Sequence, residues 1–403
     1  MDLANLTTRA GVYVTQPTGY KAFIPKDLPP DPPVRYDDGL WDALSRADMA
    51  LGRLDGSAEN LPNPDLFVAM YVRKEAVLSS QMEGTQASLT DLLEYEVNRP
   101  TLKSLQDVGE VVNYVAAMNY GLEHLSELPV SLRLIKEIHA KLLAGVRGSD
   151  RTPGEPRRSQ NWIGPNGTLL AQARYVPPPP DEMNRALGNL EVFIHDQTPM
   201  PALVKVGLVH SQFETIHPFL DGNGRVGRLL ITFLLCEKGA LRRPLLYLSH
   251  YLKLHRQEYY DRLQAVRDKG DWEGWLRFFI EGVCTVADEA ADTARRIVSL
   301  REQHRNAITR ELGRGAGKAL AVLEKLFYSP VVSVQTVREV TQLTYVAANT
   351  IVRHLILLDI LKETTGQYRN RRFVYAPYLA LFEEPKSAAE PAPTPEPVGP
   401  ASP

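Results

Sequence analysis

A thirteen-residue stretch, residues 216–228, gathers side chains suited to phosphate chemistry. It reads Ile-His-Pro-Phe-Leu-Asp-Gly-Asn-Gly-Arg-Val-Gly-Arg. The imidazole of His217 could take a proton from an attacking hydroxyl, and Asp221 could hold a divalent cation such as magnesium against phosphates. Arg225 and Arg228 are three residues apart, so on a helix they share one face and can grip one polyphosphate together. The stretch therefore predicts a nucleotide-polyphosphate site with a base beside it.

The flanking residues predict how this stretch is held. Apolar residues recur at helical spacing over residues 202–216, and an apolar run over 229–235 ends at Lys-Gly, which predicts helix, tight loop, helix. Gly222, Asn223 and Gly224 fall where the second helix begins. A helix start offers unpaired N–H groups and a partial positive charge, so these residues are expected to bind an anion.

Two other interpretations of the stretch remain open at this point. Taken singly, Asp221 could cap a helix and His217 could be a core histidine, but their occurrence together with the arginines favours the phosphate site. His210, Glu214, His217 and Asp221 follow spacings of four, three and four, which would suit a metal-dependent hydrolase. Pro218 interrupts the helix and would turn Asp221 off that face, so the metal interpretation ranks second.

Composition describes an ordinary water-soluble protein of two or three domains. The chain has 403 residues, 44% of them apolar and 23% charged, with a net charge of −2. Overall charge therefore gives no reason to expect nucleic acid or an anionic membrane as the main partner. Cys236 and Cys284 are both expected to be buried thiols. The N-terminus lacks a signal-peptide pattern and no apolar run is long enough to span a membrane, which predicts a cytoplasmic protein.

Periodicity predicts a mainly α fold, a helical bundle with one β-hairpin and a C-terminal winged helix-turn-helix. Residues 148–180 break the helical pattern around Pro165-Asn-Gly167, a hairpin turn signal, and then run into four prolines. The expected organisation is an irregular arm at 1–38, a helical region at 39–110, a core at 111–312, a winged helix at 318–382 and a disordered Pro-rich tail at 384–403.

The C-terminal pattern raises a second class of function. Three helical segments precede an alternating stretch around Gly366, which is typical of a winged helix. Residues 334–375 carry six Lys and Arg against three acids. This modest excess fits a DNA-binding regulator, and it fits equally a module that holds a homodimer or a target protein.

The central stretch resembles the signature of the Fic (filamentation induced by cAMP) family. That pattern is His-x-Phe-x-Asp/Glu-Gly-Asn-Gly-Arg-x-x-Arg, and residues 217–228 match every specified position. Residues 79–84, Ser-Ser-Gln-Met-Glu-Gly, resemble the family's inhibitory Ser/Thr-x-x-x-Glu-Gly/Asn motif. Residues 160–164 and 175–178 resemble the flap before the core, so the resemblance covers roughly residues 20 to 290.

The resemblance implies a Fic-type helical bundle that transfers AMP from ATP to a Ser, Thr or Tyr hydroxyl of a target protein or of the chain itself. His217 is then the general base, and Asp221 holds Mg²⁺ on the phosphates. The anion hole consists of Gly222, Asn223 and Gly224. Within it, Asn223 contacts the α-phosphate. Arg225 meets the phosphates, and Arg228 the γ-phosphate.

Four further residues are implied at the edges of the site. Ile163 and Gly164 would dock the target segment by strand addition. Tyr259 and Tyr260 resemble a pair near the adenine, although core positions explain them equally well.

The resemblance also implies autoinhibition. Glu83 would form a salt bridge with Arg228 and so occupy the donors that the γ-phosphate needs. Ser79 would hydrogen-bond within its own helix turn and help to hold Glu83. The same site could instead run in reverse and remove AMP from a modified protein, with Glu83 positioning a water molecule.

Overall fold

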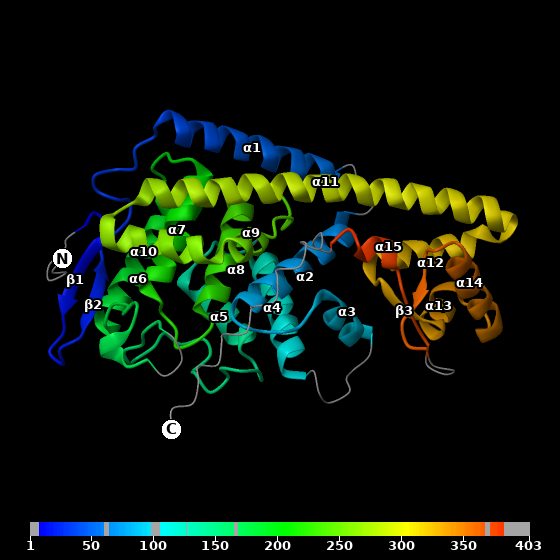
Figure 1. Cartoon of the computed structure of the whole chain (residues 1–403), viewed down its shortest axis with the longest axis horizontal. Coiled ribbons are helices and arrows are strands. Elements are labelled where there is room, and N and C mark those ends of the chain that lie inside the picture. The colour runs from blue at the N-terminus through cyan, green and yellow to red at the C-terminus, as the bar shows by residue number, and fades with distance from the viewer. Residues whose placement is uncertain are drawn as a thin grey trace, which may run out of the picture. The chain divides into compact units, whose positions relative to one another are not determined.

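The computed structural model describes residues 8–59, 64–97, 105–125, 127–164, 168–366 and 371–382. The chain divides into two compact units, one of residues 1–298 with 324–331 and one of residues 299–323 with 332–403 (Figure 1). The division falls inside a long helix, earlier than the boundary expected near residues 312–318. The N-terminal end and the tail at 384–403 lie outside the described residues.

The predicted irregular arm contains a β-hairpin, so that prediction was wrong. Strand β1 (Gly11–Thr15) pairs antiparallel with β2 (Lys21–Pro25), with Val12 opposite Ile24. Phe23 is fully buried and its N–H donates to the carbonyl of Val176 at 2.9 Å. Neither strand alternates strictly between apolar and polar residues, so the period-two signal is absent, and the prolines that follow favour irregular chain.

The first unit is otherwise helical, as predicted. Its helices before the core are α1 (Asp38–Glu59), α2 (Pro64–Met82), α3 (Leu89–Val97), α4 (Leu105–His124), α5 (Leu132–Leu142) and α6 (Pro180–His195). The helices from the core onward are α7 (Ala202–Ile216), α8 (Asn223–Glu237), α9 (Ser249–Leu254), α10 (Arg256–Lys269) and α11 (Trp272–Leu312).

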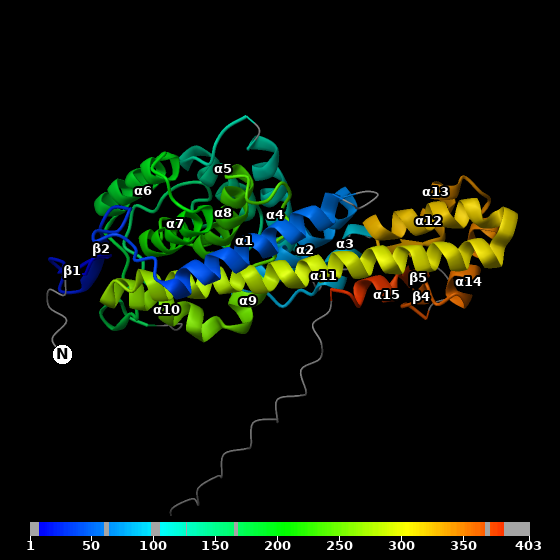
Figure 2. The ribbon, with the colours of Figure 1, turned by 90° about the horizontal axis from the view of Figure 1, so that it is seen from above.

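Helices α7 and α8 form the centre of this unit. Residues 203–216 of α7 are all buried, because α8, α6, α10 and β2 pack around them. Gly207 allows α11 to approach closely, and Trp275 Nε1 donates to its carbonyl at 2.8 Å. Helix α1 lies along the first part of α11 (Figure 2), where Arg46 pairs with Glu281. The central pair therefore forms a rigid base for the loop between its helices.

The predicted hairpin at 148–180 is less regular than expected. Its only β pairing within the described residues is an isolated bridge, in which Ile163 N donates to Tyr175 O at 2.8 Å and Tyr175 N to Ile163 O at 3.2 Å. A short 3₁₀ turn, η1 (Leu170–Gln172), stands between the two arms. The predicted turn Pro165-Asn-Gly167 lies outside the described residues. We call residues 157–178 the flap.

The C-terminal part of the chain has three helices and a small sheet in the predicted order, and it adds a short fourth helix. After η2 (Gly313–Gly315) come α12 (Ala316–Tyr328), β3 (Val331–Ser333), α13 (Val334–Thr341), α14 (Tyr345–Leu357), β4 (Lys362–Glu363), β5 (Arg372–Val374) and the added α15 (Ala376–Leu379), with strand order β3-β5-β4. Thr344 caps α14 three residues after α13 ends. This order agrees with three helices plus a hairpin, and the winged-helix assignment stays a prediction. In the described part of the chain, no helix is both long and apolar enough to cross a membrane.

Candidate functional site

The loop between α7 and α8, residues 217–222, is closed by its own side chains. His217 ends α7 in the left-handed conformation at φ 49°, and Gly222 begins α8 at φ 78°. Asn223 Oδ1 accepts from Phe219 N and its Nδ2 donates to Phe219 O, both at 2.8 Å. Both polar atoms of the Asn223 side chain therefore hold the loop, and the expected contact of Asn223 with a phosphate stays a prediction. We call residues 217–222 the phosphate loop.

Backbone N–H groups at the start of α8 are the donors available to an anion at this loop. In α8, the first backbone N–H group that donates to a carbonyl four residues earlier is that of Val226, which donates to Gly222 O. The N–H groups of Asn223, Gly224 and Arg225 precede it, so the helix itself supplies them no partner. The expected anion site thus rests on three backbone donors, reinforced by the dipole of a fifteen-residue helix.

His217 is held neutral. Burial lowers the pKa of its imidazole to about 3, and the guanidinium groups of Arg157 and Arg267 lower it further, while Glu83 opposes them. An imidazole with this pKa carries no proton at neutral pH, so it can accept one. As the first residue of the phosphate loop, it is placed to act as a general base on a hydroxyl that approaches an anion held at the start of α8.

Asp221 presents a partly exposed carboxylate beside the start of α8. Its Oδ1 accepts from Gly222 N at 2.5 Å and faces Arg225 Nη2 at 3.4 Å, and 37% of its side chain is exposed. Among the described residues, no three His, Cys, Asp or Glu side chains could hold a metal ion together. The alternative four-residue metal site with His210 and Glu214 is therefore wrong. A single carboxylate does fit Mg²⁺ that takes its other ligands from substrate phosphates and water.

Arg225 lies beneath the loop and is fully buried. Its Nη1 donates to Glu110 Oε2 of α4 at 3.3 Å. Glu110 also accepts from Thr85 Oγ1 at 2.9 Å and faces Arg147 at 3.2 Å. The expected phosphate ligand is thus engaged by a buried acid that the sequence analysis did not single out.

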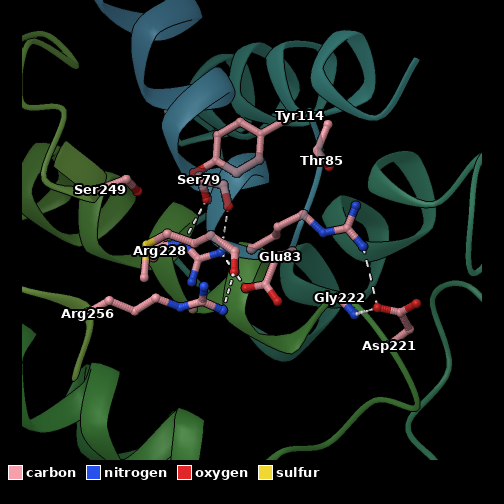
Figure 3. Close-up of polar contacts among 12 residues, drawn as sticks. Ser79, Glu83, Thr85, Tyr114, Asp221, Gly222, Arg228, Ser249 and Arg256 are labelled. Atoms are coloured by element: carbon pink, nitrogen blue, oxygen red, sulfur yellow. Dashed lines mark hydrogen bonds and ion pairs between the residues drawn. The ribbon is translucent and has the colours of Figure 1, made fainter. Parts of the chain in front are cut away.

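Glu83 pairs with Arg228, as the resemblance implied. Glu83 Oε1 lies 2.6 Å from Arg228 Nη2, and Figure 3 shows Glu83 reaching from the end of α2 toward Arg228 in α8. Burial alone would raise the pKa of Glu83, but the Arg228 guanidinium keeps it below its ordinary value. The pair is therefore a charged one, and it occupies the guanidinium beside the anion site.

Ser79 contributes differently from what was expected. Its Oγ accepts from Arg228 Nε at 2.7 Å and its carbonyl accepts from Arg228 Nη2 at 3.0 Å, so it bonds across to α8 rather than within its own turn. Glu75, one turn earlier on the same face of α2, is buried and accepts from Ser249 and Tyr114. Burial raises the pKa of Glu75 to about 7. One face of α2 thus presents a polar row toward Arg228.

The C-terminal end of α2 is fastened by two arginines. Arg147 Nη2 donates to Glu83 O at 3.2 Å and Arg256 Nη2 donates to Met82 O at 3.1 Å. Both satisfy carbonyls that a helix end leaves without partners. These contacts hold Glu83 where it meets Arg228.

The two tyrosines expected near adenine differ in environment. Tyr259 is buried, and its hydroxyl bonds His210 Nε2 at 2.9 Å, which makes it a core residue. Tyr260 packs against it at 5.1 Å between ring centroids and lies near Arg256. Ile163 is 37% exposed at the flap and Gly164 packs against Thr168.

Four charged residues around the site were not predicted from the sequence: Glu110, Arg147, Arg157 and Glu75. Nothing in the local sequence distinguishes the last three, which are common charged residues outside the motif. A weak signal exists for Glu110, which stands within an otherwise apolar helical pattern that includes Val108 and Val111.

Together the fold and the site define a mainly helical protein in which an acid at the end of one helix, Glu83, pairs with an arginine in the first turns of another, Arg228. Residues 41–123 match the Fic/DOC family N-terminal model and residues 129–235 match the Fic/DOC family model. The chain therefore contains the N-terminal and Fic domains of the Fic/DOC family.

Similar proteins agree with this assignment. The chain is 31% identical over 188 residues to the protein adenylyltransferase Fic of Aedes aegypti, covering 45% of this chain and 34% of that protein. It is 27% identical over 175 residues to a probable protein adenylyltransferase of Aquifex aeolicus, covering 43% and 51%. The match thus spans about a third of the mosquito protein's length. A Fic family protein from Desulfovibrio desulfuricans shares the fold at a TM-score of 0.56 and 19% identity, over 85% of this chain and 97% of that one.

Proposed function

We propose that this protein is a protein adenylyltransferase, which moves AMP from ATP to a Ser, Thr or Tyr hydroxyl of a protein and releases pyrophosphate. One observation carries the proposal: the unprotonated imidazole of His217 begins the short loop that leads into α8, a helix whose first backbone N–H groups have no partner within the helix. The names of the relatives support the same reaction. The acceptor can be a target protein or the chain itself.

The reaction needs one proton transfer and one displacement. The acceptor oxygen attacks the α-phosphorus, and its proton passes to His217. A bond forms between that oxygen and phosphorus while the bond from phosphorus to the β-phosphate oxygen breaks, so pyrophosphate leaves with the electron pair. The N–H groups at the start of α8 stabilise the charge that develops on the α-phosphate. Asp221 would hold Mg²⁺, which would neutralise charge on the phosphates.

The proposed enzyme is held in an inhibited state by Glu83. Its carboxylate uses the guanidinium of Arg228 that the γ-phosphate requires and would repel that phosphate. Charge-assisted hydrogen bonds contribute roughly 1.5–3 kcal/mol, so removal of Glu83 is expected to raise transfer about 10- to 100-fold.

Incorporation of label from α-³²P-ATP tests the proposal. Glu83→Gly is expected to label itself or a co-incubated protein strongly, and Glu83→Gly with His217→Ala is expected to bind ATP without labelling. Gln86→Gly, an exposed change just beyond α2, serves as the matched control. A mass increase of one AMP on the labelled protein identifies the product. An unlabelled Glu83→Gly protein would refute both the transfer and the inhibition.

Removal of AMP is a second candidate, favoured by one observation. Glu83 lies close enough to His217 for its charge to oppose the lowering of the imidazole pKa, so it could orient a water molecule toward the same base. Incubation of an AMP-modified protein with the parent and with Glu83→Gln separates the two. Release of AMP by the parent alone would assign the reverse reaction.

A further inference from the structure

The flap is joined to the phosphate loop by three consecutive carbonyl groups. Arg157 Nε donates to His217 O at 3.0 Å and Arg157 N donates to Pro218 O at 2.8 Å. Asn161 Nδ2 donates to Phe219 O at 3.0 Å. Every carbonyl from His217 to Phe219 therefore accepts a hydrogen bond from the first arm of the flap.

Arg157 also joins the two arms of the flap. Its Nη1 donates to Ser159 O at 3.1 Å in the first arm, and its Nη2 donates to Pro178 O at 2.5 Å at the end of the second. The side chain is 1% exposed, and its described partners are carbonyl groups rather than carboxylates. Burial lowers its pKa to about 10, so the guanidinium stays charged at neutral pH.

This arrangement holds His217 in an unusual backbone conformation. A non-glycine residue at φ 49° is uncommon and persists where its surroundings fix it. Arg157 bonds the carbonyl of that residue, and the partly buried Asn161 contact holds the loop two residues later. The backbone of the base is therefore tied to the first arm of the flap.

The geometry points to Arg157 and Asn161 as positioning residues that keep the acceptor-binding flap and His217 in register. This inference rests on the proposed transfer reaction, in which the flap presents a hydroxyl to His217. A misplacement of about 1 Å between reacting groups can cost on the order of 100-fold in rate. Neither residue contacts the donors between Gly222 and Arg228, so ATP binding is expected to be independent of them.

Arg157 and Asn161 differ in charge, so their loss should affect the pKa of His217 differently. The charged groups that act on His217 are Arg157 of the flap and Arg267 of α10, which lower the imidazole pKa, and Glu83 of α2, which raises it. Loss of the Arg157 cation should therefore raise the pKa of His217. Loss of the neutral Asn161 amide should leave it in place.

The test uses the full chain in the Glu83→Gly background and measures labelling of the protein itself as a function of ATP concentration and pH. Arg157→Gln and Asn161→Ala are each expected to lower the maximal rate about tenfold or more while the half-saturating ATP concentration stays within about twofold. The acid limb of the pH profile should move to higher pH in Arg157→Gln, and stay in place in Asn161→Ala and Arg157→Lys. Arg158→Ala, an 88% exposed neighbour, is the control and should match the background.

Maximal rates that stay within about twofold of the background, or ATP binding that weakens in step with them, would overturn the positioning role. If Arg157→Gln does not fold, the maximal rate and ATP dependence of Asn161→Ala test the positioning role by themselves. A background protein that never transfers AMP would refute the proposed function instead, so the two failures are distinguishable.

Discussion

The carboxylate of Glu83 occupies the space directly in front of Gly224. A Cβ built on Gly224 would overlap Glu83 Oε1 and come within 2.9 Å of Arg228 Nη1. The glycine is thus what lets an acid from α2 reach the start of α8. The same position would face a bound phosphate, so inhibitor and nucleotide are expected to compete for one space.

This relationship predicts a coupling between two substitutions. In the parent, Gly224→Ala should destabilise the fold, because the new methyl group displaces Glu83 from Arg228. In Glu83→Gly the overlap with Oε1 is absent and only the end of the Arg228 side chain has to shift, so Gly224→Ala should destabilise that protein much less than the parent. Thermal unfolding of the four proteins measures the coupling. Equal shifts in both backgrounds would show that Glu83 does not occupy that space.

Arg147 is expected to act as a latch on the inhibitory end of α2. It bonds the Glu83 carbonyl and the Glu110 carboxylate, yet 53% of its side chain is exposed. Arg147→Ala should raise labelling about fivefold, as expected for the loss of about 1 kcal/mol of hydrogen bonding. Arg151→Ala, on the same loop and paired only with exposed Asp150, should leave labelling unchanged. Equal labelling in both variants would exclude the latch.

Glu110 should matter for stability more than for chemistry. In Glu110→Ala the fully buried guanidinium of Arg225 keeps only the 3.4 Å contact to Asp221 among its described ion pairs. Because removing one partner of a buried pair costs about 3–5 kcal/mol, the free energy of unfolding should fall by that amount. Glu110→Gln should cost less, because it keeps an acceptor. Chemical denaturation measures both. Arg133→Ala, which breaks the pair with Glu137 from its 74% exposed side, should cost under about 0.5 kcal/mol.

Glu214 predicts a pH dependence of stability. Its Oε1 lacks a hydrogen-bond partner among the described residues, and burial raises the pKa of Glu214 to about 7 from 4.5. The folded state then holds a proton that the unfolded state releases, so stability is lost as pH rises from 4.5 to about 7. Glu214→Gln removes this dependence, and its advantage over the parent should grow across that window by up to about 3 kcal/mol. Melting temperatures at pH 5 and 8 provide the measurement, and a constant difference would contradict the assignment.

The second unit provides a test of DNA binding. Residues 299–323 and 332–382 carry 11 Lys and Arg against 5 Asp and Glu in a chain of net charge −2. If α14 reads DNA, the full chain should shift a duplex at about 50 mM salt and release it near 200 mM. Arg353→Ala on the exposed face of α14 should weaken binding about fivefold or more, and Arg310→Ala on α11 should not. No shift at low salt would favour a role in holding dimers or targets.

Much of the site was predictable because its chemistry is local. Helix, loop and helix follow from apolar spacing around residues 216–228, and the glycines at 222 and 224 stand where a left-handed cap and a close approach require them. The pairing of Glu83 with Arg228 came from a family resemblance, since the residues are 145 positions apart. Neither the composition nor the local residue spacing relates these two positions to each other.

The sequence by itself determined which groups are available: a base, an acid, two arginines and a helix start within thirteen residues. Tertiary structure decided how they are used. Burial turned Asn223 inward to hold its own loop, assigned Arg225 to Glu110, and engaged Arg157 with three carbonyls. A buried polar group must find a partner, and the identity of that partner depends on which distant helices pack together, which no local pattern specifies.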